Sequence, residues 1–154
     1  METYRDCFRE PIPEFDTVVN LLEAAANAHL AGDSRLAANL IAEANMSIIR
    51  DWLESLWGKQ SPYVQFREIP DAPPVIPKKE RLDMRMPNAM EKQALIDRDG
   101  YHCRFCGLPV IRPEVRKRLH NFYPDALPWG RTNDSQHAAF QAMWLQYDHI
   151  EKWV

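Results

Sequence analysis

Cys103 and Cys106 are the residues of this sequence whose type and spacing point most directly to chemistry. In a Cys-x-x-Cys pair the two sulfurs can converge on one metal ion, and Gly107 lets the turn continue with a positive φ. Zinc takes four ligands, so the pair would supply half of a structural zinc site. Two alternatives stay open: a redox pair, which normally opens a helix after a strand, and two buried cysteines that bind no metal.

Asp148 and His149 form a second candidate pair. Adjacent residues on a strand point to opposite faces, but a bend or a strand end can bring both side chains to one site. There the Asp148 carboxylate would hold a divalent cation, and the His149 imidazole would take a proton from water. The alternative is a chance dipeptide, because so short a motif needs its structural context.

The remaining cysteine and histidines are expected to be structural. Cys7 stands alone, and an odd total of three cysteines fits a reducing compartment better than a disulfide scaffold. A partly buried structural role is expected for His102, His120 and His137 rather than zinc ligation. The large aromatic residues of the C-terminal half are expected in the core rather than on a base-stacking surface. They are Phe122, Tyr123, Trp129, Phe140, Trp144, Tyr147 and Trp153.

The elements that precede these residues begin with a pair of helices. Apolar residues recur at three- and four-residue steps over residues 17–30 and again over 34–57. Gly32 would end the first helix, and Asp33 or the serine after it would cap the second. No second copy of this unit follows, so a helical-repeat array is not expected. We interpret helices 14–57 as an accessory hairpin that binds a protein partner or a second copy of the chain.

A proline-rich stretch divides the chain. Residues 61–87 hold six of the 12 prolines and are expected to form an extended linker. The linker separates a helical hairpin of residues 1–60 from a domain of residues 88–154, which starts with a helix that Asn88 caps and Gly100 ends. The knuckle is then followed by a short strand over 108–111, a helical turn over 112–119, a loop over 120–135, a helix over 136–145 and the start of a strand around 147.

The charge of the chain is unevenly distributed. The formal net charge is −3, but residues 1–58 carry 10 acidic against 4 basic residues, whereas residues 78–118 carry 11 basic against 6 acidic residues. A local positive field attracts a polyanion, which indicates nucleic acid as a partner of the cysteine-containing half. No apolar run is long enough to span a membrane, and the first residues lack the apolar core of a signal peptide. A cytoplasmic protein is therefore expected.

The ordered combination of ALIDRDGYHCRFCG with a later DHI resembles the front half of an HNH endonuclease domain. In that family a helix ends in an Arg-Asp-Gly turn, a Cys-x-x-Cys knuckle follows, and a later strand ends in Asp-His-Ile or Asp-His-Val. The matching residues are Arg98, Asp99, Gly100, Cys103, Cys106, Gly107, Asp148, His149 and Ile150. The resemblance covers about residues 88–154. It implies an α+β chain, mostly helical, in which the hairpin and linker precede the front part of a ββα-metal unit.

The resemblance also implies roles for individual residues. His149 would be the general base that activates water for attack on a DNA phosphodiester, and Asp148 would hold a Mg²⁺-like ion. Cys103 and Cys106 would hold half of a structural zinc. Phosphate contacts, dependent on salt and largely independent of sequence, would come from basic residues. These are Arg98, Arg104, Arg112, Arg116, Lys117 and Arg118.

Two departures from the family pattern qualify these expectations. The 41 residues between Cys106 and Asp148 are more than the family needs, so we expect an insertion there. The second Cys-x-x-Cys and the last metal-ligand helix do not follow His149. We therefore expect the domain of residues 88–154 to be C-terminally incomplete and to cut DNA weakly or not at all alone. The alternatives are a non-enzymatic zinc-knuckle DNA-binding or adaptor protein, and assembly with another chain that completes the zinc site.

Overall fold

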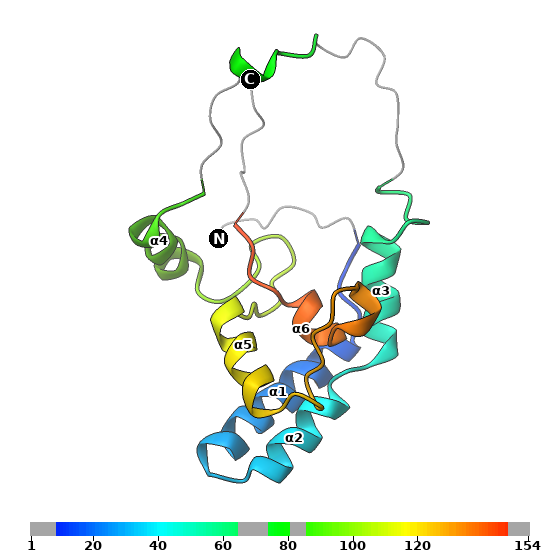
Figure 1. Cartoon of the computed structure of the whole chain (residues 1–154), viewed down its shortest axis with the longest axis vertical. Helices are drawn as coiled ribbons and strands as arrows, with labels where there is room; N and C mark the ends of the chain where they lie inside the picture. Colours follow the sequence, from blue (N-terminus) through cyan, green and yellow to red (C-terminus); the bar gives the residue numbers. More distant parts are fainter. Residues whose placement is uncertain (1–8, 65–73, 81–85, 148–154) are drawn as a thin grey trace.

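The described part of the chain is almost entirely helical. The computed structural model describes residues 9–64, 74–80 and 86–147, and these form six α-helices and two short 3-10 helices (Figure 1). The α-helices are α1 (Glu14–Leu30), α2 (Ser34–Glu43), α3 (Ser47–Trp57), α4 (Ala89–Asp99), α5 (Pro113–Phe122) and α6 (Ala138–Ala142). The 3-10 helices are η1 (Lys78–Glu80) and η2 (Asn133–Ser135).

The mostly helical character is thus confirmed, but the β component of the expected α+β class is not found. Among the described residues there is no β-sheet and no ββα unit, and strand-like pairing is limited to isolated bridges. The expected strand over residues 108–111 is reduced to two such bridges, at Pro109 and Ile111. The proline-rich stretch holds only η1 within its described residues, 61–64, 74–80 and 86–87.

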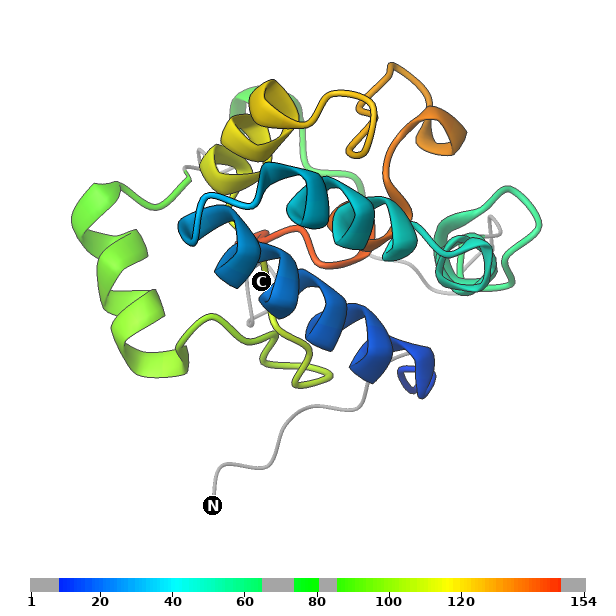
Figure 2. The ribbon, with the colours of Figure 1, turned by 90° about the horizontal axis from the view of Figure 1, so that it is seen from below.

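The N-terminal hairpin forms where the sequence predicts it, because its turn residues have the required chemistry. Gly32 adopts a φ of 83°, which suits glycine, at the end of α1. The Asp33 side chain then accepts a hydrogen bond of 3.0 Å from the Leu36 amide and caps α2. Figure 2 shows α1 and α2 lying side by side.

The second helix of the hairpin is shorter than predicted. A single helix over 34–57 is wrong, because the chain ends α2 at Glu43 and begins α3 at Ser47. At the break the Asn45 side chain accepts a hydrogen bond of 2.8 Å from the Ala138 amide, at the start of α6. The Asn45 side chain thus gives a partner to an amide in the first turn of α6, which has none within its own helix. The break turns α3 away from the direction of α2, as Figure 2 shows.

The hydrophobic core joins the N-terminal helices to the stretch between the cysteine knuckle and Asp148. One cluster packs α1 and α3 against α6, and the other packs α1 and α2 against the residues around Leu127. From the stretch predicted to be an insertion, both clusters take buried residues: Tyr123, Leu127, Ala138, Ala139, Phe140 and Met143. That stretch therefore packs on the apolar faces of α1 and α2, and the protein partner expected for these helices stays a prediction.

The secondary structure of that stretch also differs from the prediction. In place of a helical turn over 112–119, α5 is a regular helix with Pro113 at its first position, where the missing N–H is harmless. The helix predicted over 136–145 is limited to α6. No helix in the described residues is both long and apolar enough to cross a membrane.

His137 lies at the point where this stretch meets the N-terminal helices. Its side chain is fully buried, and its Nε2 lies 2.7 Å from the Ile41 carbonyl oxygen, which fits a neutral ring that donates from Nε2. Burial lowers the pKa of His137 to about 4, although the Ile41 carbonyl partly opposes the shift. The structural role expected for this histidine agrees with that position.

The free energy of unfolding is expected to fall as the pH is lowered from 6.5 to about 4. Unfolded His137 gains a proton near pH 6.5, whereas the folded ring stays neutral until about pH 4, so acid favours the unfolded chain by up to about 3 kcal/mol. Urea titrations across this window should show that His137→Gln, which keeps a donor for Ile41, flattens the dependence. The exposed control His102→Gln should leave it unchanged; an equal slope in wild type and His137→Gln would contradict the assignment.

Candidate functional site

Helix α4 places the cysteine knuckle. Asn88 and Glu91 form a reciprocal capping box, in which the Asn88 side chain accepts from the Glu91 amide at 3.0 Å. Gly100 ends the helix with a φ of 66° and turns the chain into Tyr101. Both ends were predicted from the sequence, and both are confirmed. The helix stands apart from the other helices in both views (Figures 1 and 2).

The knuckle itself is a small hairpin closed by backbone hydrogen bonds. The Cys103 amide donates to the Leu108 carbonyl at 2.7 Å, and the Gly107 amide donates to the Cys103 carbonyl at 2.8 Å. Gly107 has a φ of 74°, the positive value expected from the sequence. An antiparallel bridge between His102 and Pro109 continues the hairpin. The fold thus holds both cysteines in one tight turn, as two thiols that form no disulfide.

The electrostatics of the pair favour a thiolate. A hydrogen bond with the Cys106 side chain lowers the pKa of Cys103 to about 5, with further help from the backbone amides of Cys106 and Phe105 and against the opposing effect of burial. A thiolate is the form that binds a metal ion. In the described residues no group of three or more His, Cys, Asp or Glu side chains gathers at one point. The knuckle therefore supplies two ligands of a possible tetrahedral set.

Asp148 and His149, the predicted catalytic pair, lie outside the described residues. The segment that leads to them runs beside the chain that leaves the knuckle. The Ile111 amide donates to the Met143 carbonyl at 2.6 Å, and the Leu145 amide donates to the Ile111 carbonyl at 3.0 Å. This pairing is parallel and joins the segments on either side of α5 and the long stretch after it.

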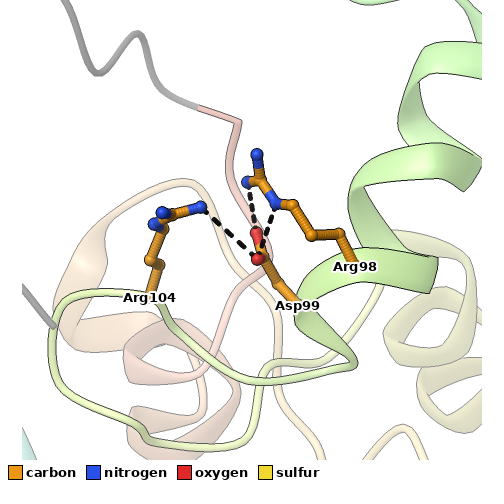
Figure 3. Close-up of polar contacts among 3 residues, drawn as sticks. All are labelled: Arg98, Asp99 and Arg104. Atoms are coloured by element: carbon orange, nitrogen blue, oxygen red, sulfur yellow. Dashed lines mark hydrogen bonds and ion pairs between the residues drawn. The ribbon is translucent and has the colours of Figure 1, made fainter. Parts of the chain in front are cut away.

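Arg98 and Arg104, two of the predicted phosphate contacts, gather on Asp99 (Figure 3). Arg98 donates to both carboxylate oxygens of Asp99, at 2.8 and 2.6 Å, while an Arg104 nitrogen lies 3.5 Å from the Asp99 carboxylate. The hydrogen bond from Arg98 contributes most to lowering the pKa of Asp99. These contacts join the end of α4 to the knuckle. The predicted phosphate role of the two arginines stays a prediction.

The other predicted phosphate contacts lie on or just before α5. Arg112 lies 5.6 Å from the centre of the Tyr101 ring. Arg116 lies 4.0 Å from the centre of the Trp129 ring, and its burial there lowers the pKa of its guanidinium. Lys117 and Arg118 are exposed. Arg112 is exposed as well, so Arg116 is the one member of this group that is less accessible to a polyanion.

Sequence reasoning missed the aromatic partners of these arginines. Trp129 is held in place by an antiparallel bridge to Gln136, whose carbonyl in turn accepts from Arg50 of α3 at 2.5 Å. Trp144 lies with its ring centre 5.7 Å from that of Trp129. The available signal was that tryptophans follow a basic helix, but Arg116 precedes Trp129 by 13 residues and Trp144 by 28, and no local pattern pairs residues so far apart. No protein-family model, curated protein or solved structure matches the chain.

Replacing either knuckle cysteine with serine is expected to abolish zinc retention. Zinc needs both thiolates of this pair, because one remaining sulfur cannot chelate. Elemental analysis after exchange into zinc-free buffer should find zinc in the wild type and almost none in Cys103→Ser or Cys106→Ser. The control Cys7→Ser should retain zinc. Equal zinc in all four proteins would contradict the knuckle assignment, and one zinc per two chains would indicate a site shared between copies.

Proposed function

We propose that the chain is an HNH-type nuclease that hydrolyses phosphodiester bonds in DNA, with weak activity when it acts alone. The observation that carries the proposal is the cysteine knuckle, a hydrogen-bonded hairpin with Gly107 at positive φ directly after the Arg98-Asp99-Gly100 turn. This local geometry and the order of the motifs agree with the family resemblance. The segment leading to Asp148 returns to the same part of the fold by pairing with Ile111, which further supports the proposal.

In the proposed reaction, His149 accepts a proton from a water molecule as the water oxygen attacks the phosphorus atom. The bond from phosphorus to the leaving oxygen then breaks. Asp148 would be an oxygen ligand for a divalent cation such as Mg²⁺, and Cys103 and Cys106 would be two ligands of a structural zinc. When bound, the divalent cation would stabilise the negative charge that develops on the phosphate and the leaving oxygen.

Positive charge beside the knuckle would bind the nucleic acid. Arg112, Lys117 and Arg118 are exposed on one short segment, which contains Glu114 as its one acidic residue. Contacts of such side chains with phosphates release counterions and give an affinity that falls with salt. The N-terminal half carries an excess of acidic residues, and its apolar side packs into the core. The net charge of the whole chain therefore does not describe the charge of the segment that holds Arg112, Lys117 and Arg118.

A second candidate function is non-catalytic nucleic-acid binding by a zinc-knuckle protein. It is favoured by the finding that no group of three or more His, Cys, Asp or Glu side chains gathers in the described residues. The two functions differ in their response to mutation. For the nuclease, His149→Ala removes metal-dependent cleavage; for the binding protein no cleavage occurs, whereas Lys117→Gln with Arg118→Gln weakens DNA binding and His149→Ala leaves it intact.

A further inference from the structure

Three strand-like segments bring a set of aromatic and arginine side chains together beside the knuckle. The Val110 amide donates to the Tyr101 carbonyl at 2.9 Å, and Ile111 forms a bridge with Trp144. Tyr101 and Trp144 are therefore on the two chain segments that flank residues 110–111. Helix α5 starts at once afterwards. We name Tyr101, Arg112, Arg116, Trp129 and Trp144 the aromatic–arginine surface.

The side chains of this surface alternate rings with guanidinium groups. Arg116 lies 4.0 Å from the centre of the Trp129 ring and 6.0 Å from that of Trp144, and the two indoles meet edge to face at 73°. Arg112 lies over Tyr101. The Nε of Arg116 is buried and makes no hydrogen bond within the described residues. Ring contacts therefore hold Arg116 in place and bring its positive charge next to the indoles.

Two of the rings are open to solvent. Trp144 is 38 % exposed and Tyr101 is 43 % exposed, although the core of the protein has aromatic side chains that are almost fully buried. Exposed aromatic faces interleaved with cations are the chemistry that binds single-stranded nucleic acid, because unpaired bases stack on rings while phosphates meet the cations. Basic residues outnumber the acid Glu114 over residues 112–118, so the charge of the surface complements the same ligand.

We propose that the aromatic–arginine surface binds single-stranded nucleic acid, with unpaired bases stacked on Trp144 and Tyr101 and phosphates on Arg112, Lys117 and Arg118. The inference rests on the nucleic-acid binding of the proposed function and adds the form of the substrate. Bases inside a duplex are already paired and stacked, and they are not available to side chains unless they are flipped out. A single strand, or an unpaired region within a duplex, is therefore preferred over regular duplex DNA.

The test measures binding by fluorescence anisotropy with the full chain, in buffer with zinc and without Mg²⁺. The probes are a labelled oligothymidylate of ~12 nucleotides, within the span that such surfaces cover, and its duplex with oligoadenylate. The wild type should bind the single strand more tightly than the duplex. Trp144→Leu, which keeps apolar bulk but loses the flat ring, should weaken single-strand binding about tenfold, whereas Trp144→Phe should largely retain it.

A matched control and a second variant make the result specific. Trp57→Leu changes a tryptophan that is 61 % exposed at the end of α3 and should bind like the wild type. Tyr101→Leu should weaken single-strand binding while leaving the thermal unfolding midpoint unchanged. Equal binding by the wild type, Trp144→Leu and Tyr101→Leu, or a preference for the duplex, would overturn the inference. Because this assay contains no Mg²⁺, it can fail while His149-dependent cleavage stands, and it can succeed where no cleavage is found.

Discussion

Replacing Leu127 with alanine is expected to lower the free energy of unfolding by about 3 kcal/mol. The Leu127 side chain is fully buried in a core cluster that also contains Ala25 of α1 and Ala37 and Ile41 of α2. Two of these cluster members are alanines, whose short side chains cannot move to fill the space that the substitution leaves. The cost therefore includes both the lost burial and the cavity. Urea unfolding followed by circular dichroism measures it.

The control for this prediction makes the same chemical change on the surface. Leu30, at the end of α1, is 83 % exposed, and Leu30→Ala should alter the free energy of unfolding by less than about 0.5 kcal/mol. Helicity of the whole chain should be lost in one transition if the N-terminal helices and residues 123–143 share a core. Similar small effects of Leu127→Ala and Leu30→Ala would show that the stretch around Leu127 does not pack on α1 and α2.

Local chemistry made several features predictable from sequence. Gly32, Gly100 and Gly107 all occupy positions of positive φ, and Asp33 and Asn88 both cap helices with their side chains. In each case the residue type and its immediate neighbours decide the conformation. The turn of the hairpin, the start and end of α4 and the turn of the knuckle could therefore be placed without a structure.

Features that depend on distant partners could not be placed in the same way. The break between α2 and α3 forms where Asn45 accepts the Ala138 amide, 93 residues away. The residues after α5 were predicted to be a loop because Pro124, Pro128 and Gly130 interrupt any helical period. Nothing local indicates that Leu127 and Phe140 complete the core of the N-terminal helices. The position of Arg116 over the Trp129 ring could not be predicted either. It leaves Arg116 less exposed than Lys117 and Arg118 on the same helix.

The candidate site also has parts that the sequence predicts and parts that it does not. The knuckle was predicted from the sequence and is formed. The ion pair of the neighbouring Asp99 with Arg104 could not be predicted by any sequence rule. The roles of Asp148 and His149 stay predictions, since these residues lie outside the described part of the chain. The roles that the family resemblance gives to Asp148 and His149 are the most specific prediction about function. A mutation at His149 therefore has the largest expected effect on activity.

His149→Ala is expected to reduce metal-dependent DNA cleavage by at least about 100-fold, the lower end of what a general base contributes. Without the imidazole, no positioned group takes the proton from the attacking water. The variant should retain zinc, because His149 has no part in the proposed zinc site, and should bind DNA like the wild type. His120→Ala is the matched control: this histidine lies 2.7 Å from the Leu127 carbonyl oxygen through Nδ1 and has no proposed catalytic role.

The most direct test of the nuclease proposal is the nicking of supercoiled plasmid by excess purified protein with and without Mg²⁺ or Mn²⁺. A single cut converts the plasmid to the open circular form, so slow cleavage is detected. We predict slow nicking by the wild type and His120→Ala, which requires the divalent cation and is lost in His149→Ala. Equal nicking by the wild type and His149→Ala would contradict it, and no nicking by the wild type would favour the non-catalytic binding protein.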